Sequence, residues 1–430
     1  MSESSKLRVA IVGGGPAGLL AAILLARQGI RSVVFERQSW PVDKVCGEGI
    51  MPNGVEVLER YGVLERIDRS RSRPFYGVRY VDSTGRTAQG RFHGKPGRVV
   101  RRIALSEALF EIAREENLID LRAKHELCSL NEQSSSIGVE VHDLADGAKK
   151  SITGFDYVIG ADGLRSKVRR LAGLDGNAKN SPGKQPGRMG ARIHYAIEPW
   201  DDLVQVWWQD GIECYVAPSS NGCVEFNFGW DNDRLHPRKN CGEVLSLEEG
   251  LFRFFPELAA RVKGARATSE MRSWGPLPQR ATRPLLGRVA LIGDAGVFYD
   301  QITGEGLSLA FLQAELLTNS IGDWGTERGR RRFTRGVQKL ADHYIRITDF
   351  AMFFTRHPRF RSAMIWLLSR SPKLFSHMMH ANMGQAALVG PALLHAVQAV
   401  AWPASPVPRH EAAPQARVLE RTTHGPAGRA

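Results

Sequence analysis

The sequence predicts an α/β protein in which a Rossmann-like dinucleotide-binding domain is combined with a β-rich second domain and C-terminal helices. Three observations support this: a glycine-rich turn between an apolar strand and an apolar helix near the start, period-two alternation in the middle, and a basic, apolar C-terminal part. At 430 residues the chain has room for two or three domains. Hydrophobic residues at 43% and charged residues at 24% are typical of globular proteins and argue against a disordered chain.

The first 36 residues have the pattern of a nucleotide-binding βαβ unit. An apolar strand leads into GGGPAG at positions 13–18, an apolar helix follows, and a second strand ends at Glu36. Gly13 permits the tight turn, Gly15 lets the backbone approach a pyrophosphate, and Gly18 lets helix and strand pack closely. The free N–H groups at the helix N-terminus bind phosphate, and Glu36 can accept hydrogen bonds from a ribose. The unit therefore predicts dinucleotide binding.

Two later segments repeat the pattern of a buried strand followed by an acidic residue. The strand at 155–160 is followed by Asp162, and the strand at 287–292 by Gly293 and Asp294. The sequence TGEG at 303–306 then begins another apolar helix. The N-terminus of that helix can stabilise negative charge on a bound cofactor.

These three segments resemble, in order and spacing, motifs of the FAD-dependent oxidoreductase superfamily that includes aromatic hydroxylases (group A flavin monooxygenases) and geranylgeranyl reductase-like proteins. The resemblance covers roughly residues 7–317 and implies FAD as cofactor, with NADPH or NADH as electron donor. No second GxGxxG is visible for that donor. The cofactor-binding residues that the resemblance implies are Gly13, Gly15, Ala17, Gly18, Glu36, Arg37, Arg102, Asp162, Gly293, Asp294, Gly304 and Gly306.

Within this set, Asp294 is expected to bind the ribityl or pyrophosphate region of FAD. Arg102 matches the family's cofactor arginine at the start of a helix, although Arg101 competes for that role. No metal site is expected, because the five cysteines are scattered and lack a CxxC. The cysteine pattern also excludes a disulfide framework and favours a cytoplasmic location.

The loop 45–52 is the expected source of catalytic side chains. It resembles the CGEG loop of geranylgeranyl reductase-like proteins, which the superfamily places against the flavin ring. Cys46 either contacts substrate there or is a small buried residue, and Glu48 either is a polar active-site group or lies on the surface. Cys46 and Glu48 are therefore the candidate catalytic residues.

Departures from family patterns limit the reaction that can be assigned. Val297 and Gln301 stand where hydroxylases commonly carry His and Pro. A halogenase is disfavoured because its WxWxIP segment is absent, and the TGEG sequence leans toward the reductase-like branch.

The expected domain division is discontinuous. Residues 1–180 and 275–330 form the FAD-binding domain, and 181–274 form the β-rich substrate domain, where strands alternate apolar and polar residues. Such a sheet covers the substrate pocket in this superfamily. Aromatic side chains that could line the pocket, or belong to the core, are Trp207, Tyr215, Phe226 and Phe228.

Residues 331–402 are expected to be helical, and 403–430 a disordered tail rich in Ala, Pro and Arg. Twelve Lys or Arg but only two Asp occur between Arg328 and Lys373, which concentrates the net charge of +13 in this part. A basic amphipathic helix can make peripheral contact with a membrane, or it can cap the core with a charged outer face. No nucleic-acid-binding signature accompanies the charge. Neither a signal peptide nor a spanning helix is expected.

The expected function is NAD(P)H-dependent monooxygenation, in which the reduced flavin reacts with O2 and an apolar aromatic, polyketide or quinone-like small molecule is hydroxylated. The alternative is a geranylgeranyl reductase-like enzyme that reduces prenyl double bonds without oxygen. A third class is a non-catalytic flavin-binding protein, which would show no substrate-stimulated oxidation of NAD(P)H.

Overall fold

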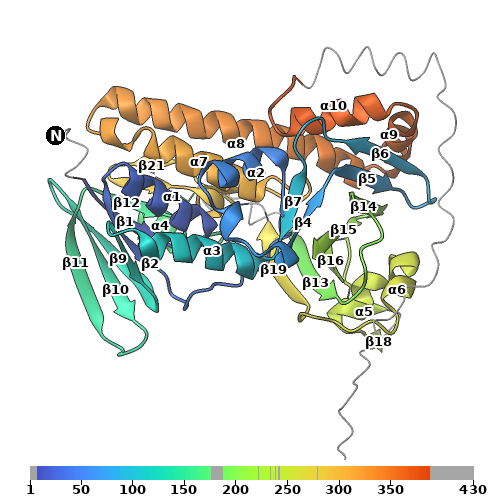
Figure 1. The fold of residues 1–430 in the computed structure, drawn as a ribbon, viewed down its shortest axis with the longest axis horizontal. Helices are drawn as coiled ribbons and strands as arrows, with labels where there is room; N and C mark the ends of the chain where they lie inside the picture. Colours follow the sequence, from blue (N-terminus) through green and yellow to red (C-terminus); the bar gives the residue numbers. More distant parts are fainter. Residues whose placement is uncertain are drawn as a thin grey trace, which may run out of the picture.

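The computed structural model describes residues 7–175 and 187–387, apart from residues 221, 233, 238, 241, 242 and 278. Figure 1 shows a nucleotide-binding part, a second large sheet beside it, and a long helix that runs along both. The expected linker around residue 180 and the expected tail 403–430 lie outside the described residues.

A mostly parallel six-stranded sheet forms the centre of the nucleotide-binding part. Its strand order is β21-β22-β12-β1-β2-β8, and only β21 is antiparallel to its neighbour. The strands are β1 (Arg8–Val12), β2 (Arg31–Phe35), β8 (Ile119–Arg122), β12 (Tyr157–Gly160), β21 (Leu285–Leu286) and β22 (Val289–Leu291).

Alternate residues of β1 face two different layers. Val9 and Ile11 pack against α1 (Pro16–Arg27), α3 (Arg102–Glu115) and α7 (Gly306–Thr318). Ala10 and Val12 pack against a three-stranded sheet of β9 (His125–Glu132), β10 (Ile137–Asp143) and β11 (Lys149–Phe155). The central sheet is covered on both faces, which explains why its strands are continuously apolar.

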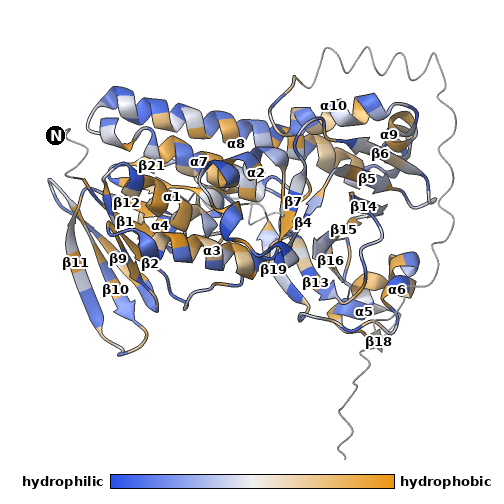
Figure 2. Ribbon diagram, viewed as in Figure 1, coloured by the Kyte–Doolittle hydropathy of each residue, from blue (hydrophilic) through white to orange (hydrophobic). Residues whose placement is uncertain are grey.

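Helix α1 is apolar on all sides because it is buried on all sides. Residues 16–26 are buried without exception, and Pro16 at the first position suits the helix start. Figure 2 shows the contrast between the hydrophobic α1 and the mixed colouring of α8 (Glu327–Arg356).

Several smaller sheets and short helices accompany the two main sheets. One sheet has three strands: β3 (Gly49–Ile50), β4 (Ser72–Phe75) and β7 (Gly97–Val100). Two more sheets are strand pairs, β17 (Lys239–Asn240) with β18 (Glu243–Val244) and β20 (Gln279–Arg280) with β23 (Val297–Phe298). The short helices are α2 (Pro52–Arg60) and α4 (Lys167–Leu171).

The second large sheet has the order β19-β13-β16-β15-β14-β5-β6. Its strands are β5 (Gly77–Val81), β6 (Thr87–Arg91), β13 (Arg188–Tyr195), β14 (Val204–Gln209), β15 (Ile212–Ser220), β16 (Cys223–Asp231) and β19 (Arg272–Leu277). The division expected at residue 180 therefore omits part of this sheet, since β5 comes from the first segment and pairs in parallel with β14. The sequence around β5 does not indicate that this strand pairs with β14, which lies more than one hundred residues later in the chain. We propose a domain division in which both belong to the β-rich part.

The two faces of this sheet differ in chemistry. Toward α5 (Leu247–Phe252) and α6 (Pro256–Val262) it presents an apolar face that includes Cys214, Phe226 and Phe228. The opposite face carries buried polar side chains on the alternate positions, among them Glu213 and Glu225. This second face borders the cavity described below.

As far as residue 387, where the described residues end, the C-terminal part consists of α8, α9 (Pro358–Arg370) and α10 (Pro372–Asn382). Each of the last two begins at a proline, which ends the preceding helix and suits a first helical position. Helices α9 and α10 pack on β5 and β6 through Ile365, Leu368 and Phe375 (Figure 1). Among the residues that the structure describes, no helix combines the length and apolarity required to cross a bilayer.

Candidate active site

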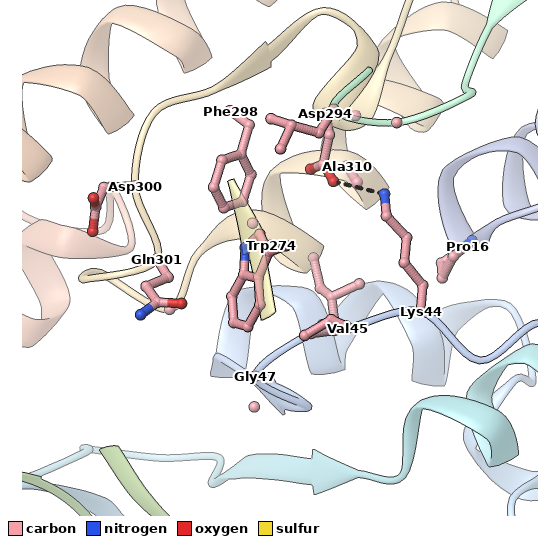
Figure 3. A pocket seen from close by; sticks show the side chains of 18 of the residues that line it. Pro16, Lys44, Val45, Gly47, Trp274, Asp294, Phe298, Asp300, Gln301 and Ala310 are labelled. Atoms are coloured by element: carbon pink, nitrogen blue, oxygen red, sulfur yellow. Dashed lines mark hydrogen bonds and ion pairs between the residues drawn. The ribbon is translucent and has the colours of Figure 1, made fainter. Parts of the chain in front are cut away.

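A cavity of about 860 Å³ lies where the nucleotide-binding part, the seven-stranded sheet and the C-terminal helices meet. One end is lined by residues of the glycine-rich turn and of the segment 293–310. The other end is lined by residues of β5, β14, β15 and the C-terminal helices. Figure 3 shows the middle, where Lys44, Trp274 and Asp294 approach from different segments.

The glycines of the N-terminal turn have two distinct roles. A Cβ on Gly13 would lie 2.4 Å from the carbonyl oxygen of Ala161, and one on Gly18 would lie 2.0 Å from that of Gly13. Both positions are therefore closed to any side chain. A Cβ on Gly15 would meet only Arg102 Nη2, at 3.7 Å, because this residue faces the cavity. Ala17 also lines the cavity.

Charged residues surround the space in front of this turn. Glu36, Arg37 and Arg102 all line the cavity. The carboxylate of Glu36 accepts hydrogen bonds from the N–H groups of Gly14 at 2.8 Å and Gln38 at 2.9 Å. The buried Nε of Arg102 has no partner among the described residues. An unpaired guanidinium group beside an open helix N-terminus suits a phosphate group.

The acidic residues after the other two strands occupy different environments. Asp162 accepts hydrogen bonds from the Ser166 hydroxyl and from the first N–H groups of α4, so its carboxylate caps that helix while the residue also lines the cavity. Asp294 pairs with Lys44 Nζ at 3.3 Å (Figure 3). Gly293 has φ of +60°, and its N–H donates to Gln313.

The turn before α7 is shaped by glycine and by a buried acid. Gly304 has φ of +68° and open space where a Cβ would be, and Gly304 and Gly306 line the cavity. Between them Glu305 accepts hydrogen bonds from Asn53 and Asn382. Burial raises the pKa of Glu305 to about 8, so its carboxyl is mostly protonated at neutral pH. The helix N-terminus therefore faces the cavity without a fixed negative charge beside it.

These features fit FAD. The open position at Gly15 leaves room for the pyrophosphate, and the guanidinium of Arg102, whose Nη2 lies nearest to that position, supplies a donor. The cavity continues from there to the α7 N-terminus, which can stabilise negative charge on an isoalloxazine ring.

The two candidate catalytic residues lie in different places. Cys46 lines the cavity, and burial raises the pKa of its thiol, so it stays protonated and is a poor nucleophile. Glu48 is 2% exposed and does not belong to the cavity lining, although Gly47 and Gly49 on either side do. From the sequence, Glu48 was expected either in the active site or on the surface. The structure shows neither, because its side chain is buried behind the cavity wall.

The carboxylate of Glu48 is held by groups from three segments: the start of α3, β13, and β15, from which the Ser219 hydroxyl donates at 3.2 Å. It accepts hydrogen bonds from the Arg102 N–H at 2.9 Å and Arg192 Nη1 at 3.1 Å, and it lies 3.0 Å from His194 Nε2. Burial alone raises the pKa of Glu48, but the hydrogen bond from His194 and the charges of Arg101 and Arg192 outweigh burial and lower it. Glu48 is therefore a charged anchor between the start of α3 and the β13 strand.

Aromatic residues line the far end of the cavity, but only one of the four expected ones does so. Tyr215 lies in the wall, whereas Trp207, Phe226 and Phe228 pack toward α5 and α6 on the other face of the sheet. Trp208 takes the place expected for Trp207. The error is one of strand parity, because neighbouring residues point to opposite faces. Further wall residues missed from sequence are Lys44, Tyr80, Asp300, Phe350, Phe354 and Met364.

We predict that Gly15→Val abolishes stable flavin binding without unfolding the protein, because the valine side chain would occupy the space in front of Arg102. The affinity for FAD, measured by flavin fluorescence titration, should fall more than about tenfold. Gly325→Val, in an exposed loop with open space around its Cα, is the control and should bind FAD like the parent. Equal affinity of both variants would refute the phosphate-binding role of Gly15.

A second prediction separates the two residues of the 45–52 loop. Glu48→Gln removes the negative charge that pairs with the buried Arg192. The change should lower the free energy of unfolding by about 3 kcal/mol and weaken FAD retention. Cys46→Ala should leave both properties intact and change turnover or product. Denaturant unfolding, flavin content and kcat are the measurements. A Glu48→Gln protein of unchanged stability that has lost only kcat would instead make Glu48 a catalytic group.

The third prediction concerns pH. Glu305 has a folded-state pKa of about 8, above its unfolded value, so the folded state binds more protons between these two pH values. The stability that Glu305 contributes is therefore lost as pH rises toward 8, by up to about 1.4 kcal/mol per pH unit. In Glu305→Gln, thermal melts from pH 5 to pH 9 should show a flatter decline. Glu257→Gln, on the surface of α6, should keep the parent profile.

Comparisons with known proteins agree with this geometry. A family model described as FAD binding domain matches residues 6–331. Asperlicin C monooxygenase of Petromyces alliaceus is 28% identical, covering 76% of this chain and 74% of its own length. The 3-hydroxybenzoate 6-hydroxylase 1 of Aquipseudomonas alcaligenes is 24% identical, covering 73% and 80%.

Among solved structures, a flavoprotein/dehydrogenase from Cytophaga hutchinsonii has the same fold, with a TM-score of 0.75 at 17% identity over 91% of this chain and 99% of that one. The family match spans about three quarters of the chain and includes the glycine-rich turn, Arg102, Asp162 and Asp294. The chain therefore belongs to the FAD-binding-domain family of flavin monooxygenases and is an FAD-dependent oxidoreductase.

Proposed function

We propose that this protein is an NAD(P)H-dependent monooxygenase that hydroxylates an apolar aromatic, polyketide or quinone-like small molecule. The observation that supports this substrate class most directly is the far end of the cavity, where the walls are aromatic and aliphatic. They include Tyr80, Trp208, Tyr215, Phe375 and Met379. The relatives are named for monooxygenation of asperlicin C and hydroxylation of 3-hydroxybenzoate, and the second of these is an aromatic ring compound.

The chain's own residues would bind and orient the reactants. When bound, FAD supplies the redox chemistry, which consists of accepting a hydride from NADPH or NADH and then reacting with O2. The N–H groups that follow Gly15 and the guanidinium of Arg102 would hold its pyrophosphate, while Glu36 and Arg37 lie at the adenosine end. Asp162, Gly293 and Asp294 would border the middle of the cofactor.

At the reacting end, the α7 N-terminus between Gly304 and Gly306 would stabilise negative charge on the reduced cofactor. Tyr80 and Trp208 meet edge to face, with ring centroids 5.6 Å apart, and Tyr80 also contacts Phe375 at 4.6 Å. Such a wall would pack against a planar ring and exclude water from the reacting end of the cavity. No protein nucleophile is required, in keeping with the protonated thiol of Cys46.

We also propose a cytoplasmic location with peripheral membrane contact through the basic C-terminal helices. The four cysteines that the structure describes are free thiols, as a reducing compartment favours. Membrane contact would bring an apolar substrate of low water solubility to the cavity.

The reaction is tested with FAD-loaded protein, NADPH and 1-naphthol as a soluble aromatic probe. Naphthol should stimulate NADPH oxidation severalfold, and a hydroxylated product should carry one oxygen atom from ¹⁸O2. Under strict anaerobiosis, product should be absent. Reduction of a prenyl alkene without oxygen would instead support a geranylgeranyl reductase-like enzyme, and absence of any stimulation across phenols, quinones and prenyl lipids would support a non-catalytic flavoprotein.

Two neighbouring tryptophans provide a matched pair for the substrate wall. Trp208→Ala should raise KM for naphthol about tenfold and divert NADPH oxidation to hydrogen peroxide, because the ring no longer fixes the substrate. Trp207→Ala, on the opposite face, should keep the parent KM. Equal KM values in the two variants would show that the aromatic wall does not contact the substrate.

A further inference from the structure

The helices α8 and α9 expose an unusual group of aromatic side chains at the corner where they meet. Phe350, Phe353, Phe360 and Trp366 are 39%, 41%, 59% and 37% exposed, respectively. They are four of the nine large hydrophobic residues that are exposed among those the structure describes. We call these four residues the aromatic rim. Isolated exposed apolar residues are normal, but exposed rings that touch one another, as Phe353 and Phe360 do, indicate a surface that contacts something.

The aromatic rim is continuous with the cavity. Phe350 belongs both to the rim and to the cavity lining, and Phe354 and Met364 line the cavity beside it. The rings of Phe350 and Phe354 lie 5.1 Å apart, and those of Phe353 and Phe354 5.4 Å apart. Phe353 in turn contacts Phe360 at 5.4 Å. A chain of touching rings therefore leads from the substrate end of the cavity to the outer surface.

Basic side chains flank this chain of rings. Arg356 and Arg359 are exposed between Phe353 and Phe360, and Lys373 is exposed at the start of α10. The guanidinium of Arg370 lies over the ring of Trp366, 4.4 Å from its centroid. Three acids approach this region: Asp231 lies 3.8 Å from Arg356, Asp210 pairs with Arg361 at 2.7 Å, and Asp349 accepts a hydrogen bond from Tyr299. The surface around the rim thus keeps a positive excess.

We propose that the aromatic rim docks on the surface of an anionic lipid bilayer and that the cavity opens there to receive an apolar substrate from the lipid. Exposed aromatic side chains suit the boundary between headgroups and acyl chains, and flanking cations are attracted to anionic lipid. This inference rests on the proposed function for its substrate, but not for the docking itself.

Charge complementarity favours lipid over a second copy of this chain as the occupant. The chain carries a net charge of +13, and the rim lies in its most basic region, so two copies that met rim to rim would repel each other. An anionic bilayer supplies both the opposite charge and an apolar layer. Self-association through the rim remains an outcome that the experiment reveals.

The test uses the full FAD-loaded chain and sedimentation with vesicles of phosphatidylcholine alone or with added phosphatidylglycerol. The parent should bind the anionic vesicles, and added salt should weaken binding because it screens charge. Phe353→Ser with Phe360→Ser should reduce binding more than about tenfold, since two rings no longer enter the bilayer. Arg359→Gln with Lys373→Gln should reduce the preference for anionic vesicles. Val244→Ser, at an 85% exposed position away from the rim, is the control and should bind like the parent.

The outcomes separate docking from catalysis, because Phe353 and Phe360 do not belong to the cavity lining. Their variants should oxidise soluble 1-naphthol at the parent rate and lose only the response to substrate presented in vesicles. Parent protein that turns over naphthol but leaves anionic vesicles unbound overturns the docking proposal, as does a rim-dependent dimer measured by light scattering without lipid. Vesicle binding without any turnover would leave docking standing and overturn the proposed function.

Discussion

Buried ion pairs hold the seven-stranded sheet against the FAD-binding part, and the cavity exists because of them. In one cluster, Glu48 accepts a hydrogen bond from Arg192 of β13 and lies beside His194 of the same strand. In the other cluster, Arg188 of β13 reaches Asp300 at 2.6 Å and also pairs with Glu213 of β15. A buried charge is costly unless it is paired. If the sheet and the FAD-binding part were separated, the charged groups that pair across their interface would lose their partners. The two clusters therefore fix how far the sheet lies from the glycine-rich turn.

The same clusters determine which carboxyl groups are charged. Burial raises the pKa of Glu213 to about 8, although Arg188 opposes this shift. Burial, followed by the charge of Glu48, raises the pKa of Glu225 well above its usual value, and the closest ion-pair contact of its carboxyl is His194 Nε2 at 3.9 Å. Three acids around Arg188 would otherwise leave net negative charge in the interior, and protonation of Glu213 reduces it.

The sequence predicted the FAD-binding part well because its signals are local. The turn GGGPAG and the acids after strands 157–160 and 289–291 each lie beside the element that they terminate. The second part was harder, because its contacts join distant segments. The strand 77–81 pairs with a strand more than one hundred residues later, and the partners of Glu48 come from positions 102, 192, 194 and 219. No local pattern around Glu48 indicates that it will be buried and charged.

The alternation of side chains along a strand explains why three of the four expected aromatic residues do not line the cavity. It also determines which side chains of the sheet face the cavity and which face the apolar core. In β14, Trp207 packs with the apolar core toward α5 and α6, while Trp208 lines the cavity. Alternation along β15 places Tyr215 in the cavity wall and Cys214 and Val216 in that apolar core. A one-residue shift of register would exchange these sets and bring Glu213 into the apolar core, where its carboxyl would be buried without the hydrogen bond from Arg188. The buried ion pairs thus set the register as well as the spacing of the sheet, and through the register they select which aromatic rings a substrate meets.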